Sequence, residues 1–224
     1  MSWPRAIVCD LDGTLIDSLP DIAASLNATL EEARLKPLPV DAVRAIVGRG
    51  ARVLIGEALD GQGAEQSPGL LDALYARFLV HYEAARATRT SLYPGVEAQL
   101  AAWQSDGIRL AICTNKPQAV TDLVVADLGL DRYFDPIIGV TDARPRKPDP
   151  AMLTACLDGM GVTAAGAVMI GDTATDVKIA RAVGLPVLIC SFGYARAPAG
   201  ELGADAVVDA WSELPAAVMN LPTP

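Results

Sequence analysis

Short apolar runs alternate with helical segments along most of the chain, and this alternation restricts the possible folds more than any other feature. A strand in the middle of a parallel sheet reads as a continuous apolar run, because helices cover both of its faces. Five such runs occur, at residues 6–9, 108–113, 136–139, 167–170 and 186–190. Helices are expected at 117–128, 150–160 and 174–183, followed by a late strand at 206–208 and a closing helix at 211–219. The pattern predicts an α/β fold with a doubly wound, Rossmann-like core built on a parallel sheet.

The stretch from about residue 19 to residue 90 interrupts this alternation. It carries helical patterns and no convincing strand, with the helices expected at 22–34, 40–46, 51–59 and 69–87. Proline and glycine near residues 17–20 and 91–95 suit turns at which a chain leaves a domain and re-enters it. The sequence therefore predicts two domains: an α/β core of residues 1–17 and 91–224, and a small α-helical cap of residues 18–90, inserted after the first strand.

Composition excludes several classes of function. The net charge of −9 argues against a nucleic-acid or anionic-membrane surface. No apolar run approaches the roughly 18 residues that a membrane helix needs, and no targeting signal precedes the first strand. Four widely spaced cysteines are typical of buried thiols in a reducing compartment, so a cytoplasmic location is expected. With His81 as the single histidine, a metal cluster built on histidines is excluded.

The first apolar run ends in two carboxylates, Asp10 and Asp12. Alternate residues of an extended segment point to the same side, so both side chains can face one site. Gly13 allows a tight turn directly afterwards. Open α/β sheets bind ligands at the carboxyl ends of their strands. There, one aspartate can act as a nucleophile, its neighbour can move a proton, and both can help to hold a hard divalent cation.

Three further strand ends carry polar residues suited to the same chemistry. Thr114 and Asn115 follow the second run and precede a helix, which favours an anion site. Lys147 can supply a fixed positive charge to phosphoryl oxygens. Asp172 can complete a magnesium site, and Asp176 can orient its neighbours or bind outer-shell water. Each signal alone is also typical of a turn or a helix cap, but four of them at strand ends of one sheet favour a single site.

The four motifs together resemble those of the haloacid dehalogenase superfamily of phosphatases, and the helical insert resembles that superfamily's small cap. The motifs are Asp-Leu-Asp-Gly-Thr at 10–14, Thr-Asn at 114–115, Lys-Pro at 147–148 and Gly-Asp-Thr-Ala-Thr-Asp at 171–176. Within the superfamily, four segments are similar to those of phosphoglycolate phosphatases: 46–51, 93–96, 113–117 and 129–135. The resemblance covers nearly the whole chain.

This resemblance implies a role for each motif residue. Asp10 would attack phosphorus and become an aspartyl phosphate. Asp12 would protonate the leaving alcohol and then activate the hydrolytic water. Mg²⁺ would be held by the carboxylates of Asp10 and Asp172 and by the backbone carbonyl of Asp12. The phosphoryl oxygens would be held by Thr114, Asn115 and Lys147.

Arg49 departs from the family pattern, because phosphoglycolate phosphatases commonly have Asn between the two glycines at 48 and 50. An arginine there can clamp a substrate carboxylate in bidentate fashion. It can equally be a solvated residue at a helix end. Both interpretations stay open, and the exact substrate stays open with them.

The resemblance implies a magnesium-dependent phosphomonoester hydrolase of carbohydrate metabolism that acts on a small phosphorylated metabolite. 2-Phosphoglycolate is the expected substrate, and the protein is expected to be a monomer or a homodimer. The alternatives are a phosphatase for an amino-sugar phosphate or pyrophosphate, and a sugar phosphomutase. A phospho-receiver signalling domain also places acidic residues, a Thr and a Lys at strand ends, but the helical insert and the Asp10–Asp12 pair argue against it.

Overall fold

The computed structural model describes residues 3–64 and 66–221. In this part of the chain, six parallel strands form one sheet in the order β5-β4-β1-β6-β7-β8. The strands are β1 (Ala6–Cys9), β4 (Arg109–Pro117), β5 (Ile137–Val140), β6 (Ala167–Gly171), β7 (Val187–Cys190) and β8 (Ala206–Val208). The α/β expectation is confirmed. The largest difference is at β4, which continues past the expected end at residue 113, with a shift of register against β5 between Cys113 and Pro117.

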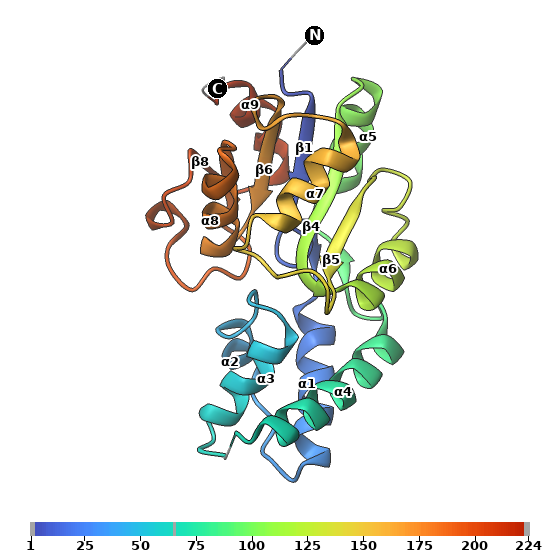
Figure 1. Cartoon of the computed structure of the whole chain (residues 1–224), viewed down its shortest axis with the longest axis vertical. Coiled ribbons are helices and arrows are strands. Elements are labelled where there is room, and N and C mark those ends of the chain that lie inside the picture. The colour runs from blue at the N-terminus through green and yellow to red at the C-terminus, as the bar shows by residue number, and fades with distance from the viewer. Residues whose placement is uncertain (1–2, 65, 222–224) are drawn as a thin grey trace.

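Helices cover both faces of the sheet (Figure 1). Alternate residues of β1 divide between two apolar clusters, with Ile7 and Cys9 on one face and Ala6 and Val8 on the other. The first cluster includes α5 (Val96–Ser105), α6 (Gln118–Asp127) and α9 (Leu214–Met219). The second includes α7 (Ala151–Met160) and α8 (Ala174–Val183), which lie in front of the sheet in Figure 1. Short 3-10 turns complete this half: η1 (Ala164–Gly166), η2 (Ala199–Glu201) and η3 (Trp211–Glu213), the last replacing the expected start of the closing helix.

Four helices lie between the short antiparallel strands β2 (Ile16–Asp17) and β3 (Ser91–Leu92). They are α1 (Leu19–Glu32), α2 (Val40–Arg44), α3 (Ala51–Asp60) and α4 (Pro68–Ala85). We call this insert the cap and the rest of the chain the core. The cap lies at one end of the sheet, with α1 packed on α4 and α4 on α3 (Figure 1). No strand occurs in the described part of residues 19–90.

The same end of the sheet gathers the polar motifs. Asp10 follows β1 directly, Thr114 and Asn115 lie in the carboxyl-terminal half of β4, and Asp172 follows β6. Since these three strands are parallel neighbours, their carboxyl ends meet at one edge, and that edge faces the cap. Among the described helices, none is both long and apolar enough to cross a membrane.

Candidate active site

Asp10 is buried at the end of β1 and is held by the core alone. Its backbone N–H donates to Ile170 O of the neighbouring strand (2.9 Å). Its Oδ1 accepts from the Leu11 N–H (2.7 Å), and its Oδ2 pairs with Lys147 Nζ (2.9 Å). Burial raises the pKa of Asp10 to about 7, although the Lys147 ammonium opposes the shift. Both carboxylate oxygens are therefore oriented before any ligand arrives.

Lys147 is a buried cation whose ammonium has a partner for each of its three N–H groups. Its side chain is 1% exposed, and its ammonium meets three acceptors: Asp10 Oδ2, Asp176 Oδ1 (2.7 Å) and Cys113 O (2.8 Å). Burial acts against its charged form, but the carboxylates of Asp10 and Asp176 hold the pKa of Lys147 above its usual value. Asn115 Oδ1 accepts from the Lys147 N–H (2.8 Å) and so fixes the loop that carries the lysine.

Asp176 holds the loop after β6 together. In the capping box at the start of α8, its Oδ2 accepts from the Thr173 N–H (3.0 Å), the Thr173 hydroxyl (2.8 Å) and the Asp172 N–H (3.3 Å). Its other oxygen receives Lys147. Both oxygens of Asp176 therefore have partners within the protein, an arrangement that fits a residue that positions its neighbours.

Three buried carboxylates, those of Asp10, Asp172 and Asp176, offer oxygens within 4.8 Å of one another. Burial, followed by the charges of Asp176 and Asp10, raises the pKa of Asp172 well above its usual value. One lysine against three carboxylates leaves the cluster short of positive charge, which is costly in a buried site unless a further cation binds or a carboxyl takes up a proton. Carboxylate oxygens are the ligands that hard divalent cations prefer. The donor set therefore fits a divalent metal ion.

Two glycines leave room for the Asp172 carboxylate. Gly13 has a φ of +84°, and a Cβ there would lie 2.2 Å from Asp172 Oδ2. A Cβ on Gly193 would lie 2.3 Å from the Asp172 Cβ. The Tyr194 N–H next to it donates to Asp172 Oδ2 (2.6 Å). Gly193 was not predicted from the sequence, since a glycine in a loop after a strand carries no signal of the carboxylate that it accommodates.

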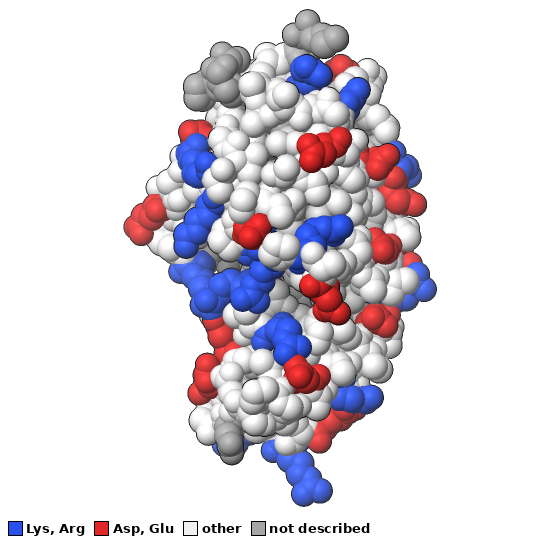
Figure 2. Space-filling view, viewed as in Figure 1, with Lys and Arg blue, Asp and Glu red and all other residues white. Residues whose placement is uncertain are grey.

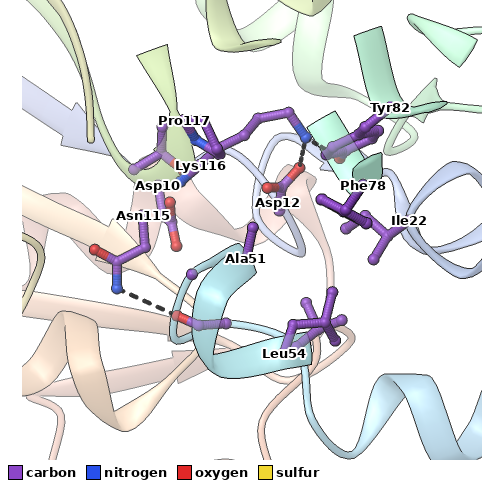
Figure 3. Close-up of a pocket in the computed structure, with 14 residues that line it drawn as sticks. Asp10, Asp12, Ile22, Ala51, Leu54, Phe78, Tyr82, Asn115, Lys116 and Pro117 are labelled. Atoms are coloured by element: carbon purple, nitrogen blue, oxygen red, sulfur yellow. Dashed lines mark hydrogen bonds and ion pairs between the residues drawn. The ribbon is translucent and has the colours of Figure 1, made fainter. Parts of the chain in front are cut away.

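Asp12 faces the cap rather than the acidic cluster. Its Oδ1 accepts from the Ser18 hydroxyl (2.6 Å) and from Lys116 Nζ (2.9 Å). Lys116 is buried, touches the Tyr82 hydroxyl of α4, and lies 4.2 Å from the centre of the Tyr82 ring. Figure 3 shows the lysine side chain extending over Asp12 towards Tyr82. The Lys116 backbone N–H donates to Thr114 Oγ1 (3.2 Å). The two aspartates of the motif thus have separate sets of partners.

A pocket of about 40 Å³ separates the core from the cap at this point (Figure 3). The core contributes polar groups to its wall, namely Asp10, Asp12, Thr114, Asn115 and Lys116, with Pro117 beside them. The cap contributes an almost wholly apolar wall of Ile22, Val47, Ala51, Leu54, Phe78 and Tyr82, with Gly48 and Gly50. Asn115 Nδ2 also donates to the Gly48 carbonyl of the cap (3.3 Å). A small, half-apolar pocket of this kind suits a small ligand.

Arg49 is not among the residues that line this pocket, so its assignment as a substrate-binding residue stays a prediction. Its side chain is 48% exposed and pairs with Glu57 of α3. It lines a different groove, together with Arg196 and Thr173, where basic side chains gather at the junction of cap and core (Figure 2). Since Arg196 also pairs with Glu57, the acid bridges the two parts of the molecule. The solvated interpretation of Arg49 fits this geometry.

Sequence reasoning also left Lys116 and Tyr82 without a role. The signal for Lys116 was available, because it is one of only four lysines and directly follows the Thr-Asn pair. Tyr82 gave no signal, since a tyrosine on a helix is most often a packing residue.

Comparisons with known proteins identify the family of the chain. A family model for haloacid dehalogenase-like hydrolases matches residues 4–184. The chain is 43% identical to a phosphoglycolate phosphatase of Rhodospirillum rubrum over 215 residues, covering 94% of this chain and 89% of the relative. It is 37% identical to a phosphoglycolate phosphatase of Caulobacter vibrioides, covering 97% and 92%. A crystal structure of a predicted phosphoglycolate phosphatase from Haemophilus somnus superimposes with a TM-score of 0.90 at 27% identity, covering 97% and 99%. The chain therefore belongs to the haloacid dehalogenase-like hydrolase family, and it is a phosphatase similar to phosphoglycolate phosphatases.

Proposed function

We propose that the protein hydrolyses 2-phosphoglycolate to glycolate and phosphate, in a reaction that depends on Mg²⁺ and passes through an aspartyl phosphate. One observation carries the mechanism: Asp10 and Asp12 line one pocket but have separate partners. Asp10 pairs with Lys147 and lies in the acidic cluster, where a phosphoryl group would need positive charge. Asp12 belongs with Ser18 and Lys116 on the cap side, where the alcohol would leave. The names of the relatives and the small size of the pocket support 2-phosphoglycolate as the substrate.

The reaction has two steps. In the first, a carboxylate oxygen of Asp10 forms a bond to phosphorus as the bond between phosphorus and the ester oxygen breaks. Asp12 gives a proton to the departing oxygen, which yields glycolate. In the second step, Asp12 takes a proton from a water molecule as that water attacks phosphorus. Phosphate leaves, and the Asp10 carboxylate is restored.

The other residues prepare Asp10 for this attack. Lys147 favours the ionised form of the carboxylate and orients it, and it adds positive charge beside the phosphoryl oxygens. Asp176 and Asn115 hold Lys147 in place, and Thr114 offers a hydroxyl at the end of β4. Asp10, Asp172 and the Asp12 carbonyl would hold the Mg²⁺, which when bound supplies positive charge to neutralise the phosphoryl oxygens.

We further propose that residues 18–90 act as a cap domain on a core of residues 1–17 and 91–224. The cap supplies the apolar wall that selects the substrate, while the core supplies the chemistry. A cytoplasmic location is proposed as well, supported by four buried cysteines that are all free thiols.

The test is phosphate release with and without Mg²⁺ from a panel of esters: 2-phosphoglycolate, pyrophosphate, amino-sugar phosphates and hexose phosphates. Asp10→Asn serves as the blank, because its amide cannot attack phosphorus. A metal-dependent preference for 2-phosphoglycolate, absent from the variant, is expected. Release from a different compound would move the substrate assignment. Full activity in purified Asp10→Asn would overturn the mechanism. Isomerised sugar phosphate would indicate a mutase, and a phospho-form lasting many minutes without turnover would indicate a receiver domain.

A further inference from the structure

We infer that Lys116 binds the carboxylate of the substrate and is the residue that selects a carboxylate-bearing phosphate ester over an uncharged one. This inference rests on the proposed function and adds the group that recognises the organic half of the substrate. Lys116 lies on the core, at the end of β4, but its side chain extends to the cap (Figure 3).

Lys116 is the one cation among the described residues that line the pocket. Its side chain is 1% exposed. Burying an ammonium costs several kcal/mol unless opposite charge and hydrogen-bond acceptors surround it. Asp12 supplies the opposite charge, and the opposite wall, with Leu54 and Phe78, is apolar. A second anion that entered this pocket would therefore meet Lys116 in a site with little water to screen the attraction.

The number of donors separates Lys116 from the other buried lysine of the site. An ammonium has three N–H groups. All three of Lys147 have acceptors, as described above. Lys116 has two acceptors among residues 3–64 and 66–221, namely Asp12 Oδ1 and the Tyr82 hydroxyl. One donor of a buried ammonium thus remains for a ligand in the pocket that Lys116 lines.

The position of Asp12 fixes which part of a ligand this donor meets. In the proposed mechanism, Asp12 protonates the ester oxygen that joins phosphorus to the organic group. Lys116 contacts Asp12 on the side that faces Tyr82 and the cap. The organic group that extends from the ester oxygen towards the cap therefore passes Lys116. In 2-phosphoglycolate a single methylene separates the ester oxygen from the carboxylate, so the carboxylate stays close to the ester oxygen and to Lys116 beside it.

A purely structural role for Lys116 makes a different prediction. If Lys116 only holds Asp12 in place, its removal slows the hydrolysis of every phosphate ester by the same factor. If it binds the carboxylate, its removal slows 2-phosphoglycolate more than an ester that lacks the carboxylate. The ratio of kcat/KM for two such esters separates the two roles, because effects on Asp12 cancel in the ratio.

The experiment compares 2-phosphoglycolate with ethyl phosphate in the wild-type protein and in Lys116→Met. The wild type is expected to prefer 2-phosphoglycolate, and the variant is expected to lose about 10- to 100-fold of that preference, as for a lost hydrogen bond between charged groups. Lys178→Met, which changes an exposed lysine of α8, is the matched control and should leave the ratio unchanged. An equal loss for both esters in Lys116→Met, or a wild type without preference, would overturn the inference.

Binding without turnover keeps this test separate from the test of the proposed function. Calorimetry in the Asp10→Asn background, with Mg²⁺ present, measures the affinity for the same two esters with and without the additional Lys116→Met substitution. Tighter binding of 2-phosphoglycolate that needs Lys116 supports the inference even if the wild type fails to hydrolyse that ester. Equal affinities overturn it. Circular dichroism checks folding, and Lys116→Gln, which keeps a donor but no charge, replaces a variant that does not fold.

Discussion

The two walls of the pocket are built on different principles. Behind the core wall, the side chains of Asp10, Lys147 and Asp176 are buried, and Lys147 pairs with both carboxylates; Asp10 directly follows β1, Lys147 lies in the loop before α7, and Asp176 lies in the first turn of α8. On the cap side, apolar residues of α1, α3 and α4 contact the pocket, and Tyr82 gives the sole polar side chain among those described. Removing one member of a buried network of charges leaves its partners unpaired, which is costly. Changing the size of one apolar side chain alters the selectivity of a pocket only moderately. We therefore expect core substitutions to stop the reaction and cap substitutions to alter which ester is accepted.

The largest effect in this comparison is expected from Lys147→Met. The substitution removes the one cation that faces Asp10 and leaves two buried carboxylates without it. Breaking such a buried pair costs about 3–5 kcal/mol of unfolding free energy. We expect kcat for 2-phosphoglycolate to fall by about 10³-fold or more, since the charge acts on the reacting group. Steady-state kinetics and urea unfolding measure the two effects. Activity within tenfold of wild type would show that the core wall is more tolerant than we argue.

Gly193→Ala tests the same wall without removing a charge. The new methyl group would collide with Asp172, because its position lies 2.3 Å from the Asp172 Cβ. A displaced Asp172 should weaken metal binding about 10- to 100-fold, as substitutions behind a metal ligand do. The measurement is the Mg²⁺ concentration that gives half-maximal phosphate release. Gly200→Ala is the control, since a Cβ there meets nothing within 4 Å. An unchanged Mg²⁺ requirement would remove Asp172 from the metal site.

Leu54→Ala sharpens the comparison from the cap side. Leu54 is buried on α3 and lines the pocket, so its truncation widens the pocket and costs about 2–5 kcal/mol of unfolding free energy. We expect kcat for 2-phosphoglycolate to change little, while its preference over a bulkier ester such as glycerol phosphate falls about 3- to 10-fold. Leu70→Ala, on the exposed side of α4, is the matched control. A loss of kcat as large as that of Lys147→Met would erase the distinction between the walls.

The sequence predicted the core wall far better than the cap wall, for a physical reason. Core residues sit at the carboxyl ends of parallel strands, and the alternation of runs places those ends at one edge. The bounds of β1, β8 and α8 agree with the expected ones, because the alternation of apolar runs and helical segments also marks where these elements begin and end.

The contact between Lys116 and Tyr82 depends on something less local. It joins a strand end to a helix 34 residues earlier, and it forms only once α4 has packed against the core. Hydrophobic periodicity predicts which residues of the cap form helices, but it does not predict how those helices are oriented relative to the sheet. The direction of the Arg49 side chain depends on the same rotation.

Arg49→Ala is expected to have the smallest effect. The side chain is half exposed, its partner Glu57 keeps Arg196, and exposed pairs contribute about 0.2–1 kcal/mol. We expect kcat/KM for 2-phosphoglycolate to stay within about threefold of wild type, with an unchanged preference over ethyl phosphate. Arg52→Ala is the matched control, because Arg52 is about equally exposed in the first turn of α3 and pairs with Asp72. If Arg49→Ala instead lost as much preference as Lys116→Met, the substrate carboxylate would belong to Arg49, and the cap would have to close further on the core than it does in this structure.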